Sequence, residues 1–170
     1  MPKAVKLYVR YVDALNRTVG RFAMYLVFAM MGVLLYSSIS RILPFDVPVI
    51  WVVEVAQMTM AAYYLLGGGY SMQLDSHVRM DLLYGRWSIK RRGFTDSVTA
   101  FCLVFYLVFL LFGAISSTQY AIEYNQKNYS VWAPPMAPIK VIMTMGIAMM
   151  LLQAISMFFK DLARARGKEI

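Results

Sequence analysis

The chain has 170 residues, of which 60% are apolar and 15% are charged, and its formal net charge is +8. A soluble domain has about 45–50% apolar and about 25% charged residues, so this chain has too few polar side chains to cover a surface in water. The length fits a single domain, residues 1–170, and excludes an additional soluble catalytic domain. The single Cys excludes an internal disulfide and a cysteine metal cluster.

The first predicted element is an amphipathic helix over about residues 3–19. Apolar side chains recur every three to four residues from Val5 to Val19, and Lys6, Arg10, Asp13 and Arg17 recur on the opposite side as a mostly basic polar face. Such a helix is suited to lying on an anionic inner leaflet. Nucleic-acid binding is the alternative interpretation of the basic face, but an apolar run begins at once, which favours the membrane surface.

Four runs without a formal charge follow, at residues 22–40, 55–74, 97–122 and 141–159. A helix needs about 20 residues to cross the hydrocarbon core, so each run is long enough. In lipid the backbone polar groups must be satisfied within the segment, which favours helices over barrel strands of half this length. The predicted fold is therefore an all-α membrane protein with four transmembrane helices, at about 22–43, 47–74, 95–123 and 138–160.

The basic residues predict the orientation of these spans. Fourteen of the 17 Lys and Arg residues lie before the first span, in the connection 75–96 and in the C-terminal tail, and three lie in the other two connections. The positive-inside rule then places both termini and residues 75–96 in the cytoplasm. The three Trp residues, Trp51, Trp87 and Trp132, lie near predicted span ends, as is typical of interfacial anchors.

The residue types needed for catalysis are few. The only His is His77, at the predicted inner end of the second span, so a bis-histidine haem site cannot be built, and neither Cys102 nor an intramembrane Ser has an evident general base. The glycines at 67–69 lack the Lys-Ser/Thr of a phosphate loop. The sequence thus predicts no catalytic, metal or cofactor site. Small residues four apart instead favour close helix packing, in the pairs Gly67/Ser71 and Gly113/Ser117.

Glu54 is the ionisable residue that stands out. Counted from Val47, it lies about two turns into the second predicted span, where a carboxylate is costly and often functional. One interpretation is a coupling-ion or proton site. We favour a contact to another helix or subunit, because no acidic companion lies near Glu54. Within the chain Lys140, at the start of the fourth span, is the first candidate partner and Arg41 the second. A water-filled crevice or a partner subunit is the alternative surrounding.

The order of features resembles a known family. Ser40-Arg41-Ile42-Leu43-Pro44 follows the first span, Trp51-Val52-Val53-Glu54 opens the second, His77-Val78-Arg79-Met80-Asp81 follows it, and a Pro-rich aromatic stretch over 129–140 precedes the last. Together these motifs resemble the small membrane subunit, of the DctQ type, of tripartite ATP-independent periplasmic (TRAP) transporters. Candidate structural or subunit-contact residues are Arg41, Trp51, Glu54, His77, Arg79, Asp81, Trp132 and Lys140.

The resemblance implies a scaffold without catalysis or cofactors in a bacterial or archaeal inner membrane. A separate large subunit would carry an organic anion, mostly a carboxylate, together with sodium through an elevator motion, and a periplasmic binding protein would deliver it. Phospholipid is the other expected partner, and nucleic acid is not expected. Two alternatives from other classes are a membrane-anchor subunit of a respiratory redox complex and a self-sufficient small transporter.

Overall fold

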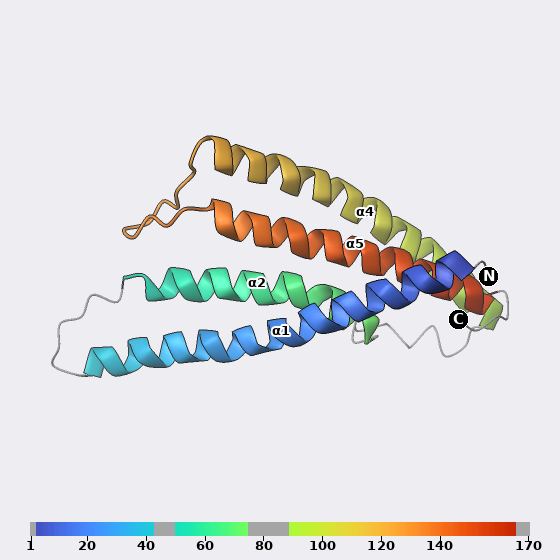
Figure 1. The fold of residues 1–170 in the computed structure, drawn as a ribbon, viewed down its shortest axis with the longest axis horizontal. Coiled ribbons are helices and arrows are strands. Elements are labelled where there is room, and N and C mark those ends of the chain that lie inside the picture. The colour runs from blue at the N-terminus through green and yellow to red at the C-terminus, as the bar shows by residue number, and fades with distance from the viewer. Residues whose placement is uncertain (1–2, 43–49, 75–88, 166–170) are drawn as a thin grey trace.

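The chain forms a layer of long helices. The computed structural model describes residues 3–42, 50–74 and 89–165 (Figure 1). Outside its helices, this part of the chain has no strand, only an isolated bridge between Lys127 and Pro135. The predicted all-α class is confirmed. The four helices are α1 (Lys3–Ile42), α2 (Val52–Gln73), α4 (Ile89–Glu123) and α5 (Ala137–Ala165).

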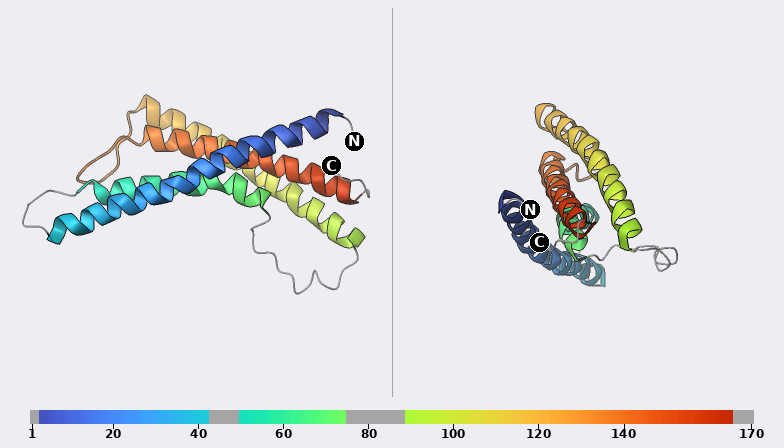
Figure 2. Two further views of the ribbon diagram at one scale, coloured as in Figure 1. Left: turned by 60° about the horizontal axis from the view of Figure 1, so that its bottom comes forward. Right: turned by 90° about the vertical axis from the view of Figure 1, so that its right-hand side faces the viewer.

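Two helices lie in the middle of the layer and two at its edges. α2 packs against both α1 and α5, and α4 packs on the other side of α5, while the first half of α1 crosses over the last part of α5 (Figures 1 and 2). The start of α1, the end of α2, the start of α4 and the end of α5 all lie at one end of the bundle (Figure 1). The described helix ends that flank the segments with a predicted cytoplasmic location thus lie at one end of the bundle. The side of the membrane on which this end lies stays a prediction.

The outward faces of the edge helices are apolar. Phe28 of α1 is 68% exposed and Phe112 of α4 is 70% exposed, although both are large apolar side chains. Three helices are long and apolar enough to cross a membrane, within Ala4–Ile42, Val98–Glu123 and Ala137–Ala163. α2 has a suitable length of 22 residues, but it contains a Glu, two Gln and three glycines and is less apolar. The four-span count therefore stays a prediction.

The predicted division between an interfacial helix at 3–19 and a first span at 22–43 is wrong. α1 is one helix of 40 residues, about 60 Å long at 1.5 Å per residue. Gly20, which marks the expected boundary, does not end the helix. It lets α1 approach α2, because a side chain at this position would collide with Tyr70.

The other predicted helix ends are shifted. α2 begins at Val52 and not at 47, and its first helical hydrogen bond runs from Val55 N to Trp51 O over 3.0 Å. α4 begins at 89 instead of 95, and α5 ends at 165 instead of 160. The last two differences have one cause. A charged residue ends an apolar run, but Lys and Arg are good helix formers and the helix continues into water.

Glycines in the middle of the layer allow α2 and α5 to approach closely. A Cβ at Gly146 would lie 2.9 Å from the backbone carbon of Leu65, and one at Gly68 would lie 2.8 Å from the sulfur of Met150. The predicted packing positions Gly67 and Gly113 are different, since neither has an atom within 4 Å of where a Cβ would lie. The close contact between α2 and α5 is thus made by the face of α2 that carries Gly68 and not by the face that carries Gly67.

This difference between glycines can be tested with one substitution type. Gly→Ala in a helix gains about 1 kcal/mol of helix propensity wherever it is made. Gly146→Ala also forces the Leu65 backbone away, which costs about 1–3 kcal/mol. We expect Gly146→Ala to lower the thermal unfolding temperature in detergent and the matched Gly113→Ala to leave it unchanged or raise it. Equal shifts in the two variants would contradict the close approach of α2 and α5.

Candidate functional site

A cluster of polar side chains joins the first half of α1 to the last part of α5. The carboxylate of Asp13 accepts a hydrogen bond from Lys160 Nζ at 2.6 Å, forming an ion pair. It also accepts hydrogen bonds from Gln153 Nε2 at 3.0 Å and Ser156 Oγ at 3.4 Å. The three donors lie on one face of α5, at intervals of three and four residues. One α1 carboxylate therefore holds two turns of α5.

Asn16 extends this polar cluster to a third helix. Its Nδ2 donates to Gln153 Oε1 at 2.9 Å and to Val12 O at 3.2 Å, and both amide side chains are fully buried. The Oδ1 atom of Asn16 has no hydrogen-bond partner among the described residues. This oxygen lies against Gly69 of α2, so tightly that any side chain at Gly69 would overlap it. The cluster thus fixes α1, α2 and α5 relative to one another.

The cluster suits a structural role. The side chains of Asp13 and Lys160 are only 20% and 27% exposed, so each charge needs the other to offset its loss of hydration. An unpaired amide left in the interior costs about 1–3 kcal/mol, which makes the Asn16–Gln153 bond selective for this packing. Apart from Asn16 Oδ1, the polar side-chain atoms described here bond to one another across the helix contacts.

This cluster is not predicted by the sequence pattern. The predicted interfacial helix has Asp13 on its polar face and gives Asn16 no role. A usable signal was present in α5, where Gln153, Ser156 and Lys160 fall on one face of an apolar helix. A polar line of this kind inside an apolar run indicates a buried polar contact.

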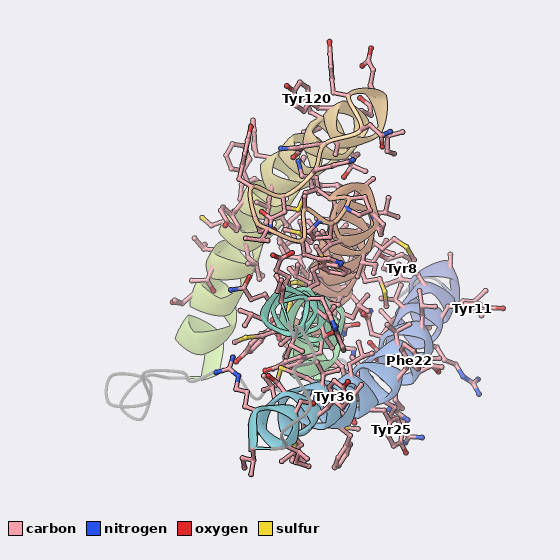
Figure 3. All side chains as sticks on the ribbon, turned by 90° about the vertical axis from the view of Figure 1, so that its left-hand side faces the viewer. Tyr8, Tyr11, Phe22, Tyr25, Tyr36 and Tyr120 are labelled. Atoms are coloured by element: carbon pink, nitrogen blue, oxygen red, sulfur yellow. The ribbon has the colours of Figure 1, made fainter. Side chains whose placement is uncertain are left out.

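The basic face of α1 stays on the outside. Gly20 contacts Tyr70 in the last turn of α2, and Asp13 contacts Lys160, the first charge after the apolar run of α5. The first half of α1 therefore crosses the ends of both central helices. Tyr11 points away from the bundle (Figure 3). The basic side chains of this segment are exposed and are available to phospholipid headgroups, at Lys6, Arg10, Arg17 and Arg21.

Tyr8 links the start of α1 to α5 through a hydrogen bond and a ring contact. Its hydroxyl donates a hydrogen bond to Leu152 O at 3.2 Å, and its ring meets that of Phe159 edge to face with centroids 6.4 Å apart.

Glu54 lies in the first turn of α2, at the opposite end of the bundle. Because Trp51 is the N-cap, Glu54 is the third helical residue and is not two turns inside the helix. The positive end of the helix dipole stabilises a carboxylate at this position. Glu54 is only 8% exposed, and its Oε2 atom has no hydrogen-bond partner in the described part of the chain. Beside it, the Trp51 ring stacks on Tyr36 of α1, with centroids 6.0 Å apart.

The structure does not bring Lys140 or Arg41 to Glu54. The Nζ atom of Lys140 donates to Gln126 Oε1 at 2.7 Å and to Ser117 O at 3.4 Å. Lys140 is thus directed towards α4. One turn further along, α4 and α5 are joined by a bond between Thr118 and Thr144 hydroxyls at 2.8 Å. Arg41 is exposed in the last turn of α1.

Trp132 lies in a loop between α4 and α5 that is held together by backbone hydrogen bonds. Met136 N donates to Gln126 O at 2.8 Å and Asn128 N to Pro134 O at 3.0 Å. This loop lies at the same end of the bundle as the start of α2 (Figure 1). Trp132 is 45% exposed there, as an interfacial anchor would be. Four residues singled out from the sequence, His77, Arg79, Asp81 and Trp87, lie outside the described residues.

An apolar groove of about 300 Å³ opens between α1, α2 and α5. The single hydroxyl in its lining, on Thr59, already donates to Val55 O at 2.7 Å. Such a groove suits hydrocarbon and offers no charge or free donor to an organic anion. Its walls include Phe22 and Leu26 of α1, Met58 and Leu66 of α2, and Ile139 and Ile142 of α5.

Long helices with apolar outward faces and with polar contacts buried between them define a helical integral membrane protein. A family model of the DctQ component of tripartite ATP-independent periplasmic transporters matches residues 7–164. The chain therefore belongs to this family, whose members are small membrane subunits of TRAP transporters in the inner membrane. The resemblance found in the sequence is confirmed, and the redox-anchor alternative receives no support. No match was found among curated proteins or among solved structures.

The Asp13 cluster generates a stability prediction. Asp13→Ala removes three acceptor contacts and leaves Lys160 half-buried without its counter-ion. We expect the free energy of unfolding to fall by about 1–2 kcal/mol. Breaking a fully buried ion pair costs roughly 3–5 kcal/mol, and the cost is smaller here because both side chains are partly hydrated. Thermal unfolding in detergent measures this loss.

Two controls make this test specific. Lys6→Ala, on the exposed face of the same helix, should leave the unfolding temperature unchanged. Asp13→Ala combined with Lys160→Met should cost less than the two single variants added together, because no unpaired charge remains. Additive losses would show that the ion pair contributes nothing to stability.

Proposed function

We propose that this chain is the scaffold subunit of a TRAP-type secondary transporter. In this proposal it supports a separate large elevator subunit that imports an organic anion, mostly a carboxylate, with sodium, delivered by a periplasmic binding protein. The observation that carries the proposal is the family match over residues 7–164. The candidate residues Arg41, Trp51, Glu54, Trp132 and Lys140 then serve packing, membrane anchoring or subunit contact.

The contacts of the described residues support a static role. The Asp13 cluster joins α1, α2 and α5, and the Thr118–Thr144 bond joins α4 to α5. Both sets of polar contacts lie between helices and hold the layer as one unit. The groove between α1, α2 and α5 is apolar and does not suit an anionic substrate. A rigid element of this kind can extend the immobile part of a transporter against which another subunit moves.

The proposed topology has four spans, with both termini and residues 75–96 in the cytoplasm. Alkaline phosphatase is active only outside the cytoplasm, so a fusion after Lys168 should be inactive and one at Lys127 active. A fusion within 43–49 should be active as well, since that connection lies on the same side as 124–136 when α2 crosses the membrane. If α2 does not cross, the fusions at 43–49 and Lys127 will give opposite results, which contradicts the four-span count.

Transport tests the scaffold role directly. Deletion of the gene should abolish sodium-dependent uptake of radiolabelled organic anions, tested with a panel of dicarboxylates and sugar acids. The level of the large subunit is followed by immunoblot, and re-expression of the wild-type chain is the control. Uptake that persists at a normal level of the large subunit would exclude the scaffold role.

A further inference from the structure

The outward face of α2 carries a regular line of side chains. Its members are separated alternately by four and three residues through the whole helix, which places them on one narrow face. Two of them, Met60 and Tyr64, come two positions after Met58 and Ala62, which line the apolar groove. Two positions correspond to a rotation of about 200° around the helix axis. The members of this line therefore face away from the groove. We call this line the α2 seam; it consists of Val53, Gln57, Met60, Tyr64, Gly67 and Ser71.

The α2 seam is exposed from Val53 to Tyr64, and Gly67 and Ser71 at its far end are half-buried. Val53, Met60 and Tyr64 are 53%, 44% and 59% exposed, and no atom lies within 4 Å of the place of a Cβ at Gly67. The other faces of α2 are occupied, since Gly69 contacts α1 and Gly68 contacts α5. α2 is thus a central helix of this layer with one free side.

The composition of the α2 seam does not suit lipid. Gln57, Tyr64 and Ser71 recur every seven residues and therefore lie in one line along the helix. Neither Gln57 nor Ser71 makes a hydrogen bond with another described residue, and Gln57 is exposed. Lipid tails offer an amide no hydrogen bond, whereas a facing helix does.

The outward face of α4 is the internal comparison. Its exposed side chains include Phe101, Phe105, Phe109 and Phe112, which are 63%, 60%, 62% and 70% exposed. Lipid covers such side chains without leaving a polar group unpaired. Over residues 101–112, α4 therefore presents an apolar edge suited to lipid, whereas the α2 seam carries small and polar residues along its length, the composition of a helix–helix interface in membranes.

We propose that the α2 seam is the surface on which a membrane-spanning helix of the large transporter subunit packs. The partner helix is apolar, has small residues opposite Met60 and Tyr64, and presents a hydrogen-bonding side chain to Gln57. The alternation of four and three residues fits a left-handed crossing of about 20°. This inference rests on the proposed function, because it assigns the face that the large subunit uses.

Three open glycines provide a matched test. Gly67 lies in the α2 seam, while Gly32 of α1 and Gly113 of α4 lie elsewhere, and none has an atom within 4 Å of its Cβ position. Each is changed to Leu in the complete chain, and the amount recovered with a tagged large subunit is measured. Gly67→Leu should reduce recovery by roughly tenfold or more, as expected for an overpacked helix contact. Gly32→Leu and Gly113→Leu should be recovered like the wild type.

A photo-cross-linker keeps the test decisive if Gly67→Leu fails to fold. An aromatic photoreactive residue replaces Met60 in the α2 seam or Phe105 on α4, a pair that conserves size. We expect an adduct with the large subunit from position 60 and none from position 105. An adduct of twice the mass of this chain, no protein adduct from position 60, or normal recovery of Gly67→Leu would each overturn the assignment of the α2 seam.

The experiments distinguish a failure of the proposed scaffold function from a failure of the proposed α2 seam interface. If the wild-type chain does not co-purify with the large subunit at all, the proposed scaffold function is wrong and the α2 seam has no such partner. If the wild type co-purifies and only Gly113→Leu or Gly32→Leu loses recovery, the scaffold function stands and the interface lies on another helix.

Discussion

The contacts of Asp13 with α5 decide the course of the first half of α1. A basic amphipathic segment in front of a membrane span could leave the bundle and lie freely on the lipid surface. Here its one acidic residue meets Lys160, Gln153 and Ser156, and Asn16 adds a buried amide pair. These bonds hold the first half of α1 against α5, and α1 continues past Gly20 as one helix. The crossing of α1 over α5 follows from these contacts.

That crossing sorts the remaining polar side chains. Asp13 of α1 accepts hydrogen bonds from α5, and Asn16 and Tyr8 donate hydrogen bonds to α5. The exposed Lys and Arg side chains of α1 stay on its outer face. At the other end of the layer Lys140 is bonded to Gln126 and is not available to Glu54. The carboxylate of Glu54 relies instead on the start of its own helix, whose dipole favours a negative charge. The partly or fully buried charged side chains at each end of the layer are thus stabilised by groups at that same end.

The sequence predicted the helical class and the order of the four long helices well, because long uncharged runs in this composition have few other solutions, but it divided α1 into two helices. It predicted their ends less well. Hydropathy reports where a side chain meets lipid, while a helix ends where its hydrogen bonds end, as at Trp51 and beyond Lys160. The Asp13 cluster could not be predicted as a unit, since its partners on α1 and α5 are 137 or more residues apart. The direction of Lys140 was missed because it depends on how α5 turns towards α4.

The modest hydropathy of α2 and the proposed subunit contact have one explanation. A helix side that faces lipid must be apolar, as α4 is over residues 101–112, whereas a helix that packs against protein on several sides can carry Gly, Ser, Tyr and Gln. α2 packs on α1 and on α5, and these contacts account for Gly68, Gly69 and Gly146 but leave Gln57, Gly67 and Ser71 unexplained. A third protein contact along the α2 seam accounts for these residues as well. The feature that makes α2 the least lipid-like helix is therefore the one that a scaffold helix between two subunits requires.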